Sequence, residues 1–142
     1  MHRINPWAVL TAACASFVSG GLWYGLLFAK TWTSLASGAA TTPMGPGHAI
    51  AQFVRDLLVV YVLAHFIAET RAFGWRGAVR VGLWVGFGFQ AMAVAGGVIH
   101  EGYPLALYAV HVGDALVKTL LSCVILGVWQ RPASPAQPVG AA

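Results

Sequence analysis

Five ionisable residues stand inside long apolar stretches of this sequence, where an unpaired charge is costly. They are Arg55, Asp56, His111, Asp114 and Lys118. In a hydrocarbon environment such a group costs on the order of 3 kcal/mol or more unless it is paired or wetted, so each is a candidate for function. Carboxyl and imidazole groups exchange protons, and a guanidinium attracts anions. Proton exchange or solute binding is therefore the chemistry that these residue types would support.

Spacing places several of these residues on common surfaces. His111, Asp114 and Lys118 recur at steps of three and four, and Ser122 continues this stripe. Asp114 precedes Lys118 by one turn, the favourable order for an ion pair within a helix. A second, partly overlapping set of polar residues shares a common depth in the membrane. At a helix rise of 1.5 Å per residue, its members lie about 10 to 15 Å below the outer membrane surface. Its members are Ser19, Arg55, Asp56, Gln90, His111 and Asp114.

The charges of this polar layer are expected to cancel. Arg55 and Lys118 balance Asp56 and Asp114 in number. A neutral, mutually paired set can persist at low dielectric as a network. We therefore expect one polar layer to which all four apolar stretches contribute.

Four apolar stretches must position these residues. They cover residues 7–28, 48–69, 78–100 and 104–129. Each has the roughly 20 residues that a helix needs to cross a hydrocarbon core of about 30 Å. The 142-residue chain is 58% hydrophobic and 8% charged, with a mean hydropathy of +0.73, which excludes a soluble globular protein of this size. We predict an all-α integral membrane protein with a four-helix bundle over residues 1–131.

Loop charges predict the orientation of the bundle. Five arginines flank the N-terminus, the second loop and the C-terminus, whereas Lys30 stands alone on the other side. These are Arg3, Arg71, Arg76, Arg80 and Arg131. Because cytoplasmic loops are enriched in Lys and Arg, both termini are predicted to be cytoplasmic. The composition of residues 33–47 predicts a mobile outer loop, and that of residues 132–142 a disordered cytoplasmic tail.

Small residues mark the faces on which helices can approach closely in lipid. The third apolar stretch carries glycines and Ala93 on one face, and Gln90 lies in the middle of that face and should point into the bundle. The first stretch carries a second GxxxG pair. The glycines expected to pack are Gly21, Gly25, Gly82, Gly86 and Gly97.

The sequence lacks the patterns that indicate several other functions. The basic residues are scattered singly, unlike the patches that bind nucleic acids. Cys14 and Cys123 stand in no metal-ligand spacing, and Glu101 beside His100 would need a third ligand to hold a metal. Nucleotide-binding, hydrolase and metalloprotease motifs do not occur. We expect no metal, no cofactor and no nucleic-acid partner, and an enzyme is the less favoured interpretation.

Two motifs carry a resemblance to a known family. One is GLWYGLLFAKTW at residues 21–32, and the other comprises Glu101-Gly102, Gly113 and ILGVW at residues 125–129. They resemble the bacterial membrane family known as domain of unknown function 1761. The resemblance implies a small four-helix protein of the bacterial inner membrane and supplies no catalytic residues. It also places five motif residues at the outer interface, as anchors or at a cavity mouth: Trp23, Tyr24, Phe28, Lys30 and Trp32.

The chain departs from the family pattern at its charges. After Gly113 the family more usually has an aromatic residue, where this chain has Asp114. The Arg55-Asp56 pair is likewise not a feature of the family. A function built on these charges would then belong to this member alone.

Three functions fit these observations, and all three place the protein in a lipid bilayer. In the first, the polar layer binds or passes a small solute or a proton, within a homo-oligomer because a single four-helix bundle encloses little space. In the second, a structural or accessory subunit pairs its buried charges with helices of a membrane protein partner. In the third, a membrane enzyme acts on lipid or quinone through His111 and Asp114, which requires a cavity open to the bilayer.

Overall fold

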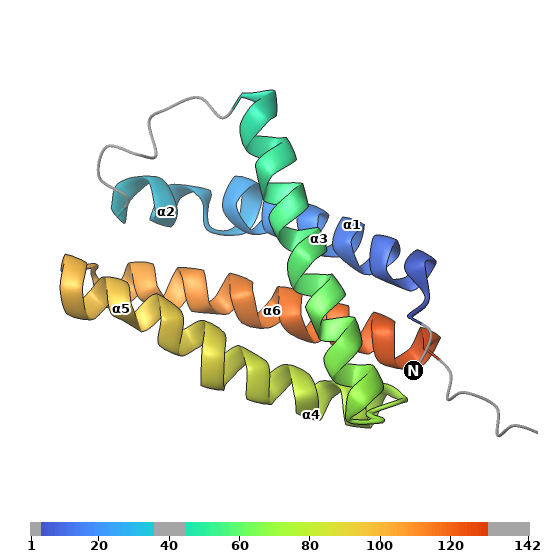
Figure 1. Ribbon diagram of the computed structural model, residues 1–142. Helices are drawn as coiled ribbons and strands as arrows, with labels where there is room; N and C mark the ends of the chain where they lie inside the picture. The colour runs from blue at the N-terminus through green and yellow to red at the C-terminus, as the bar shows by residue number, and fades with distance from the viewer. Residues whose placement is uncertain (1–3, 36–44, 131–142) are drawn as a thin grey trace, which may run out of the picture.

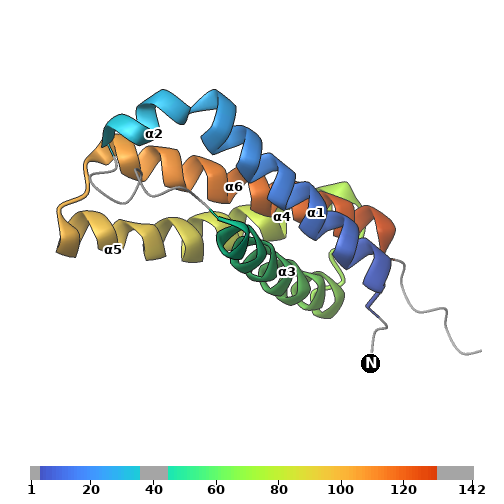
Figure 2. The same ribbon diagram turned by 90° about the horizontal axis from the view of Figure 1, so that it is seen from above.

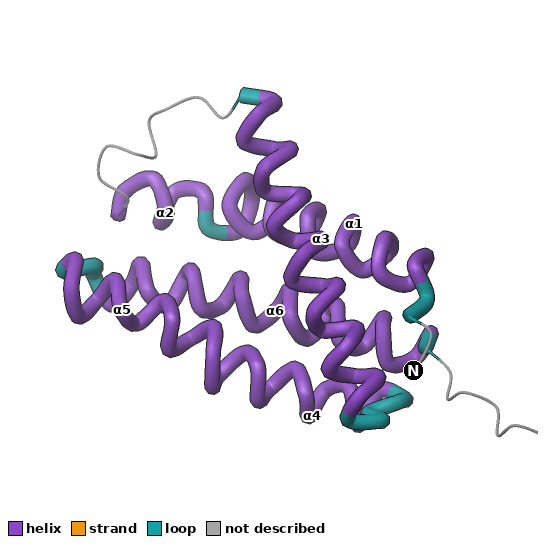
Figure 3. The backbone as a smooth tube through the Cα atoms, in the orientation of Figure 1, coloured by secondary structure: helices purple, strands orange, loops and turns teal. Residues whose placement is uncertain are grey.

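The computed structural model describes residues 4–35 and 45–130, which are almost entirely helical (Figures 1 and 3). Four spans are long and apolar enough to cross a membrane: Pro6–Leu27, Pro46–Glu69, Trp75–Glu101 and Leu105–Trp129. No strand occurs within the described residues. The predicted all-α fold with four membrane-spanning helices is therefore confirmed, and the spans begin and end close to the apolar stretches of the sequence.

Two of the spans are interrupted by π-helical turns. The first consists of α1 (Pro6–Leu22) and η1 (Trp23–Leu27), followed by a bend at Phe28 and the short helix α2 (Ala29–Leu35). The third consists of α4 (Trp75–Val85), η3 (Gly86–Ala91) and α5 (Met92–Glu101). The second and fourth spans are the uninterrupted helices α3 (Pro46–Glu69) and α6 (Leu105–Trp129). π-Helical turns are rare and concentrate at functional sites, so both interruptions are of interest.

Helix α6 is the centre of the bundle, and α1, α3, α4, α5, η3 and α2 all contact it. In two perpendicular views α1 and the α4–α5 span run beside α6, whereas α3 crosses them obliquely (Figures 1 and 2). The buried residues of α3 begin only at Asp56, and no residue from 46 to 55 is buried. Residues 46–51 are all exposed, so only the start of α3 stands apart from the rest of the described bundle.

The apolar core lies toward the end of the bundle that carries both ends of the described chain (Figure 1). Its fully buried members are mostly small, which allows the helix backbones to approach closely: Ala8, Ala12, Ala13, Ala64, Ile67, Ala78, Cys123 and Leu126. The turn between α3 and α4 closes this end, because the Gly74 N–H donates to the Gly127 carbonyl at 2.7 Å. Packing is thus tightest at the end where the chain starts and finishes.

Two segments were predicted to be irregular, the outer loop and the C-terminal tail. The loop differs in part from the prediction. The segment predicted as an outer loop begins with α2, which extends to Leu35, and ends with Pro46 and Gly47 in α3. Its remaining part, residues 36–44, and the predicted tail at 132–142 lie outside the described residues. The start of α1 and the end of α6 lie at the same end of the bundle (Figure 1), and a cytoplasmic location of that end stays a prediction.

Candidate functional site

A charged cluster joins α3 and α6 in the middle of the bundle. The Lys118 Nζ lies 3.3 Å from Asp114 Oδ2 and 3.7 Å from Asp56 Oδ2. The side chains of Lys118, Asp56 and Asp114 are 12%, 7% and 10% exposed. Gln52 extends the cluster along α3, since its Nε2 donates to Asp56 Oδ1 at 2.8 Å. We call Asp56, Asp114 and Lys118 the carboxyl–lysine cluster.

Two carboxyl oxygens of the carboxyl–lysine cluster lack a hydrogen-bond donor in the described part of the chain. Asp56 Oδ2 and Asp114 Oδ1 are buried and accept no hydrogen bond from the described residues. With both carboxyls ionised the cluster carries one net negative charge. Carboxylate oxygens without hydrogen bonds are expensive at low dielectric, so the ionised form of this group is costly.

Helix α1 completes the surroundings of the cluster with small residues. A methyl group at Gly20 would lie 2.6 Å from Lys118 Cε and 3.7 Å from Asp114 Oδ1, so the lysine occupies the space that this glycine leaves open. One turn earlier, the Ser16 and Ser122 hydroxyls hydrogen-bond at 2.7 Å, and both residues are buried. Together with α3 and α6, α1 therefore encloses the cluster.

The third span contributes an amide to the same region. Thr119 Oγ1 donates to Gln90 Oε1 at 2.8 Å, so Gln90 points into the bundle as its position predicts. Gly82 and Gly86 are buried where Leu120 and Leu116 of α6 approach. Gly97, toward the end of α5, lies instead against Tyr103 of the following turn.

Arg55 does not join the cluster directly. Its side chain is exposed, and no acidic group of the described residues lies within ion-pair distance. Its charge still acts at Tyr24, His111 and Asp114, so it lies on the same side of the bundle as these groups. At close range Lys118 alone faces the two carboxyls, so the expected neutral layer lacks one cation there.

Aromatic residues of the family-like motif fasten the first span to α6. The Trp23 indole N–H donates to the Val110 carbonyl at 3.1 Å. A methyl group at Gly113 would lie 2.6 Å from Trp23 Cζ2, so this glycine makes room for the ring. Phe28 packs on Trp23 with ring centroids 4.5 Å apart. The two motifs, far apart in sequence, thus meet at one contact.

The next residue of the motif reaches the polar stripe of α6. The Tyr24 hydroxyl and His111 Nδ1 hydrogen-bond at 2.7 Å, and Trp32 packs edge-on against Tyr24 with ring centroids 5.6 Å apart. His111 precedes Asp114 by one turn, so this pair lies between the cluster and the α2 end of the bundle. Lys30 is exposed and forms no ion pair with described residues.

Some expected site residues have no neighbour among the described residues, and other site residues were not identified from the sequence. Methyl groups at Gly21 and Gly25 would meet nothing within 4 Å, so no described helix packs on this GxxxG pair. Gln52 and Thr119 were not identified from sequence. Gln52 precedes Asp56 by one helical turn, a spacing that signals an amide–carboxyl pair, whereas no local pattern marks Thr119.

Metal binding finds no geometric support in the part of the chain that is described. No three histidine, cysteine, aspartate or glutamate side chains come together there as a ligand set. The cluster contains two carboxyls, and the third charged partner is an ammonium, which repels a cation. The site is therefore suited to protons and ion pairs.

Comparisons with known proteins agree with the motifs described above. Searches of curated proteins and of solved structures find no match to the chain. A family model described as "Protein of unknown function (DUF1761)" matches residues 7–127, from the first span to the end of α6. The matched region contains the Trp23–Gly113 contact and the whole carboxyl–lysine cluster. The chain therefore belongs to this family of membrane proteins, whose activity is not established.

Proposed function

We propose that this protein binds a proton at the carboxyl–lysine cluster and exchanges it with the compartment at the α2 end. One observation carries the proposal: two buried carboxyls share a single ammonium group. Ionised together, they would leave an uncompensated negative charge inside the membrane. A proton on either carboxyl makes the cluster neutral.

The relative energies favour a bound proton. One ion pair at about 4 Å contributes roughly 4 kcal/mol at an effective dielectric constant near 20. A second carboxylate gains similarly from the lysine, but it also repels the first carboxylate and loses its hydration, which costs several kcal/mol per ion. Two carboxyls that share a site respond by keeping one proton between them.

The groups along α6 offer a route to the cluster from one side. Tyr24 and His111 lie toward the α2 end, and His111, Asp114 and Lys118 follow one another at one-turn intervals. Beyond Ser16 and Ser122, the small-residue core closes the opposite half. Exchange with the α2 side is therefore the simplest activity. Transfer across the membrane, of a proton alone or with a small solute, would require this core to open.

A second candidate function is that of an accessory subunit in a larger membrane assembly. Gly21 and Gly25 face no other described helix, and residues 46–55 of α3 include no buried side chain. A partner helix, or another copy of this chain, could cover both surfaces. The third interpretation, an enzyme acting on lipid or quinone, has less support because Asp56 and Asp114 are only 6% and 7% exposed.

Infrared difference spectroscopy of the purified protein tests the proton site. At neutral pH the wild type should show the C=O band of one protonated carboxyl. Both Asp114→Asn and Asp56→Asn should remove that band, because each leaves one carboxylate paired with Lys118. Glu69→Gln, which alters an exposed carboxyl at the end of α3, should leave it unchanged. A band that persists in both aspartate variants would show that the proton is held elsewhere.

A flux assay then separates proton transfer across the membrane from proton exchange with one side only. Proteoliposomes containing a pH-sensitive dye and subjected to a membrane potential should acidify or alkalinise faster than empty liposomes, if the core can open. Asp114→Asn should abolish the difference and Glu69→Gln should retain it. A protein with the infrared band but no flux would exchange its proton with the α2 side only, without transfer across the membrane.

A further inference from the structure

Gln52 is the residue of α3 that bonds directly to Asp56. It stands one helical turn before Asp56, and its amide Nε2 donates to Asp56 Oδ1 at 2.8 Å. Residues 46–51 before it are exposed, whereas Gln52 is half-buried and Asp56 is buried. Gln52 therefore lies between the exposed start of α3 and the carboxyl–lysine cluster.

The two carboxyls of the cluster differ in the donors that reach them. Asp56 faces the Gln52 amide through Oδ1 and the Lys118 ammonium through Oδ2. Asp114 faces Lys118 through Oδ2, and its Oδ1 accepts no hydrogen bond from any described residue. A methyl group at Gly20 would lie 3.7 Å from Asp114 Oδ1, so the neighbour on the α1 side has no side chain to donate. Asp56 is thus the better stabilised of the two as an anion.

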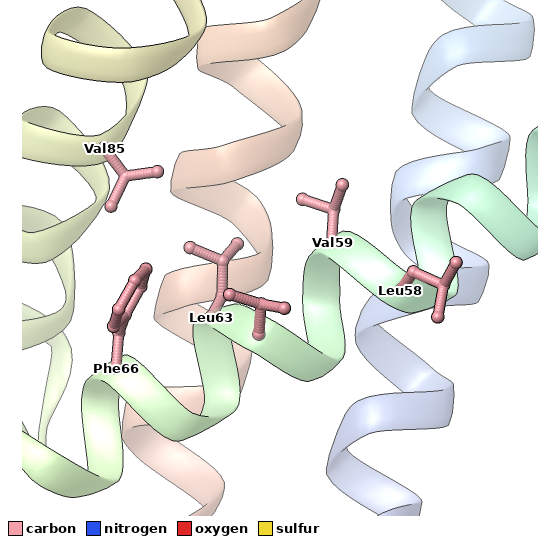
Figure 4. A pocket seen from close by; sticks show the side chains of 6 residues that line it. Leu58, Val59, Leu63, Phe66 and Val85 are labelled. Atoms are coloured by element: carbon pink, nitrogen blue, oxygen red, sulfur yellow. The ribbon is translucent and has the colours of Figure 1, made fainter.

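The other described side chains around the cluster bring no second amide to Asp56. Beyond Asp56, the side of α3 that faces α4 is apolar, as the pocket between these helices shows (Figure 4). This pocket is lined by Leu58, Val59, Val62, Leu63, Phe66 and Val85. The amide oxygen of Gln90 is bonded to Thr119 instead. Within residues 4–35 and 45–130, Gln52 is therefore the amide that makes the two carboxyls unequal.

Two opposing effects determine which carboxyl keeps its charge. Lys118 Nζ lies 3.3 Å from Asp114 and 3.7 Å from Asp56. At an effective dielectric constant near 20, this difference favours the Asp114 anion only about two- to threefold. An amide bonds a carboxylate more strongly than a neutral carboxyl, which favours the Asp56 anion roughly tenfold. The hydrogen bond from Gln52 therefore outweighs the shorter distance from Lys118 to Asp114.

The remaining charged and titratable groups near the cluster do not reverse this order. Arg55 attracts negative charge at Asp114, but it is exposed, and its effect there is weaker than the repulsion from Asp56. His111 and Tyr24 lie on the α2 side of Asp114 and hydrogen-bond to each other. The segments α1 and η3, which pack on α6, contain no charged residue. The preference for an ionised Asp56 is therefore retained.

We propose that Gln52 keeps Asp56 ionised and so assigns the exchangeable proton to Asp114. This inference rests on the proposed function, because it says which carboxyl of the cluster holds the proton. Asp56 and Lys118 form a constant ion pair, and Asp114 gains its proton from the α2 side and returns it there. Delivery to Asp114 is direct, since His111 precedes it by one turn on α6. Gln52 is a positioning residue that acts through Asp56.

Isotope-edited infrared spectroscopy can locate the proton. The aspartates of the sequence are Asp56 and Asp114, so aspartate labelled with ¹³C at its side-chain carboxyl reports on the cluster alone. In Asp114→Glu produced with this label, a proton at position 114 gives an unshifted C=O band, and a proton on Asp56 gives an isotope-shifted band. We expect most of the band to be unshifted in Asp114→Glu and shifted in Asp56→Glu.

Gln52→Met, added to labelled Asp114→Glu, tests the role of the amide. Methionine keeps the length of the side chain but donates no hydrogen bond, so the ratio of shifted to unshifted band should rise about tenfold. Gln130→Met removes a buried amide at the end of α6, away from the cluster, and should leave the ratio unchanged. If Asp114→Glu packs poorly beside Gly20, the same comparison in labelled Asp56→Glu should raise the unshifted fraction.

The outcomes separate this inference from the proton site itself. A mainly shifted band in Asp114→Glu, an unchanged ratio in Gln52→Met, or an equal change in Gln130→Met would overturn the role of Gln52 while the cluster still holds a proton. A wild-type protein without any protonated-carboxyl band would overturn the proposed function, and this inference with it.

Discussion

At the scale of single residues, two adjacent glycines provide a sensitive probe of the cluster. Gly20→Ala would place a methyl group 2.6 Å from Lys118 Cε, whereas Gly21→Ala would meet nothing within 4 Å. Both substitutions remove a helix-destabilising glycine, so both gain roughly 1 kcal/mol of helix propensity. Overpacking costs about 1 to 3 kcal/mol and applies only to Gly20→Ala. We expect Gly20→Ala to be the less stable variant.

Reversible unfolding in mixed micelles measures this difference. Gly21→Ala serves as the control, with a free energy of unfolding equal to or above that of the wild type. Gly20→Ala should also displace the ammonium from Asp114, which would change the infrared signature of the cluster. Equal stability of the two variants would mean that Lys118 does not occupy the space above Gly20.

The buried serine pair predicts a small coupling energy between α1 and α6. Ser16 and Ser122 share one hydrogen bond at 2.7 Å. Interhelical hydrogen bonds in membranes contribute about 0.6 kcal/mol on average, because serine also bonds to its own helix backbone. A double-mutant cycle with Ser16→Ala and Ser122→Ala should therefore give a coupling of about that size. A coupling indistinguishable from zero would show that each hydroxyl is satisfied within its own helix.

Part of the cluster could be predicted from local spacing, and part could not. Asp114 and Lys118 were expected to pair because they stand four residues apart on one helix, and their oxygen and nitrogen lie 3.3 Å apart. Asp56 reaches the same lysine from α3. That contact depends on how α3 is rotated against α6, which no pattern within either helix determines. For the same reason, counting charges could not show that Arg55 faces outward.

At the scale of the elements, a π-helical turn explains why helical periodicity predicted the wrong face for part of the third span. Gly82, Gly86 and Gln90 follow a four-residue step and all face α6. A regular helix would place Ala93 on this face too, yet Ala93 is exposed. The turn η3 has more residues per turn than an α-helix and rotates the following segment. Hydropathy predicts where the span begins and ends. Which residues of its second half face α6 depends on the larger number of residues per turn in η3.

The first π-helical turn leads to a prediction about the Trp23–Gly113 contact. Gly113→Ala would force a methyl group against the indole, so Trp23 must move and its hydrogen bond to Val110 should weaken. We expect a loss of about 1 to 3 kcal/mol in stability. The indole N–H resonance of Trp23, assigned with Trp23→Phe, should shift strongly in ¹H–¹⁵N spectra.

Gly25→Ala is the matched control for this contact, because a methyl group there meets nothing within 4 Å. It lies in the same π-helical turn and should leave the Trp23 resonance in place. If both variants shift the resonance equally, the change would reflect the turn as a whole. Gly113 would then not be the residue that seats the ring.

At the scale of the whole molecule, the two halves of the bundle differ in packing. Near the chain ends, alanines and other small residues bring the helices close together, and the α3–α4 turn is bonded to the end of α6. Toward α2, α3 leans away and the contacts are those of Trp23, Tyr24 and His111. The cluster lies between these halves. A proton that enters through the loosely packed half meets the carboxyls before it meets the sealed core.

Labelling of two matched cysteines can measure which end of the bundle faces the cytoplasm. Glu69 and Glu101 are both exposed, and they end α3 and α5 on opposite sides of the membrane. In a variant lacking Cys14 and Cys123, a membrane-impermeant maleimide applied to intact bacterial spheroplasts should label Glu101→Cys at once. Glu69→Cys should react only after permeabilisation, because the arginine-rich side is predicted to be cytoplasmic.

Labelling in this pattern would place the Tyr24–His111 entrance on the outer side of the membrane. The proposed proton would then be taken from outside, in the direction in which the usual proton gradient and membrane potential drive it. The reverse labelling pattern would contradict the orientation inferred from the arginines. The two carboxyls of the cluster would still share Lys118. The cluster would then exchange its proton with the cytoplasm and would be suited to sensing cytoplasmic pH.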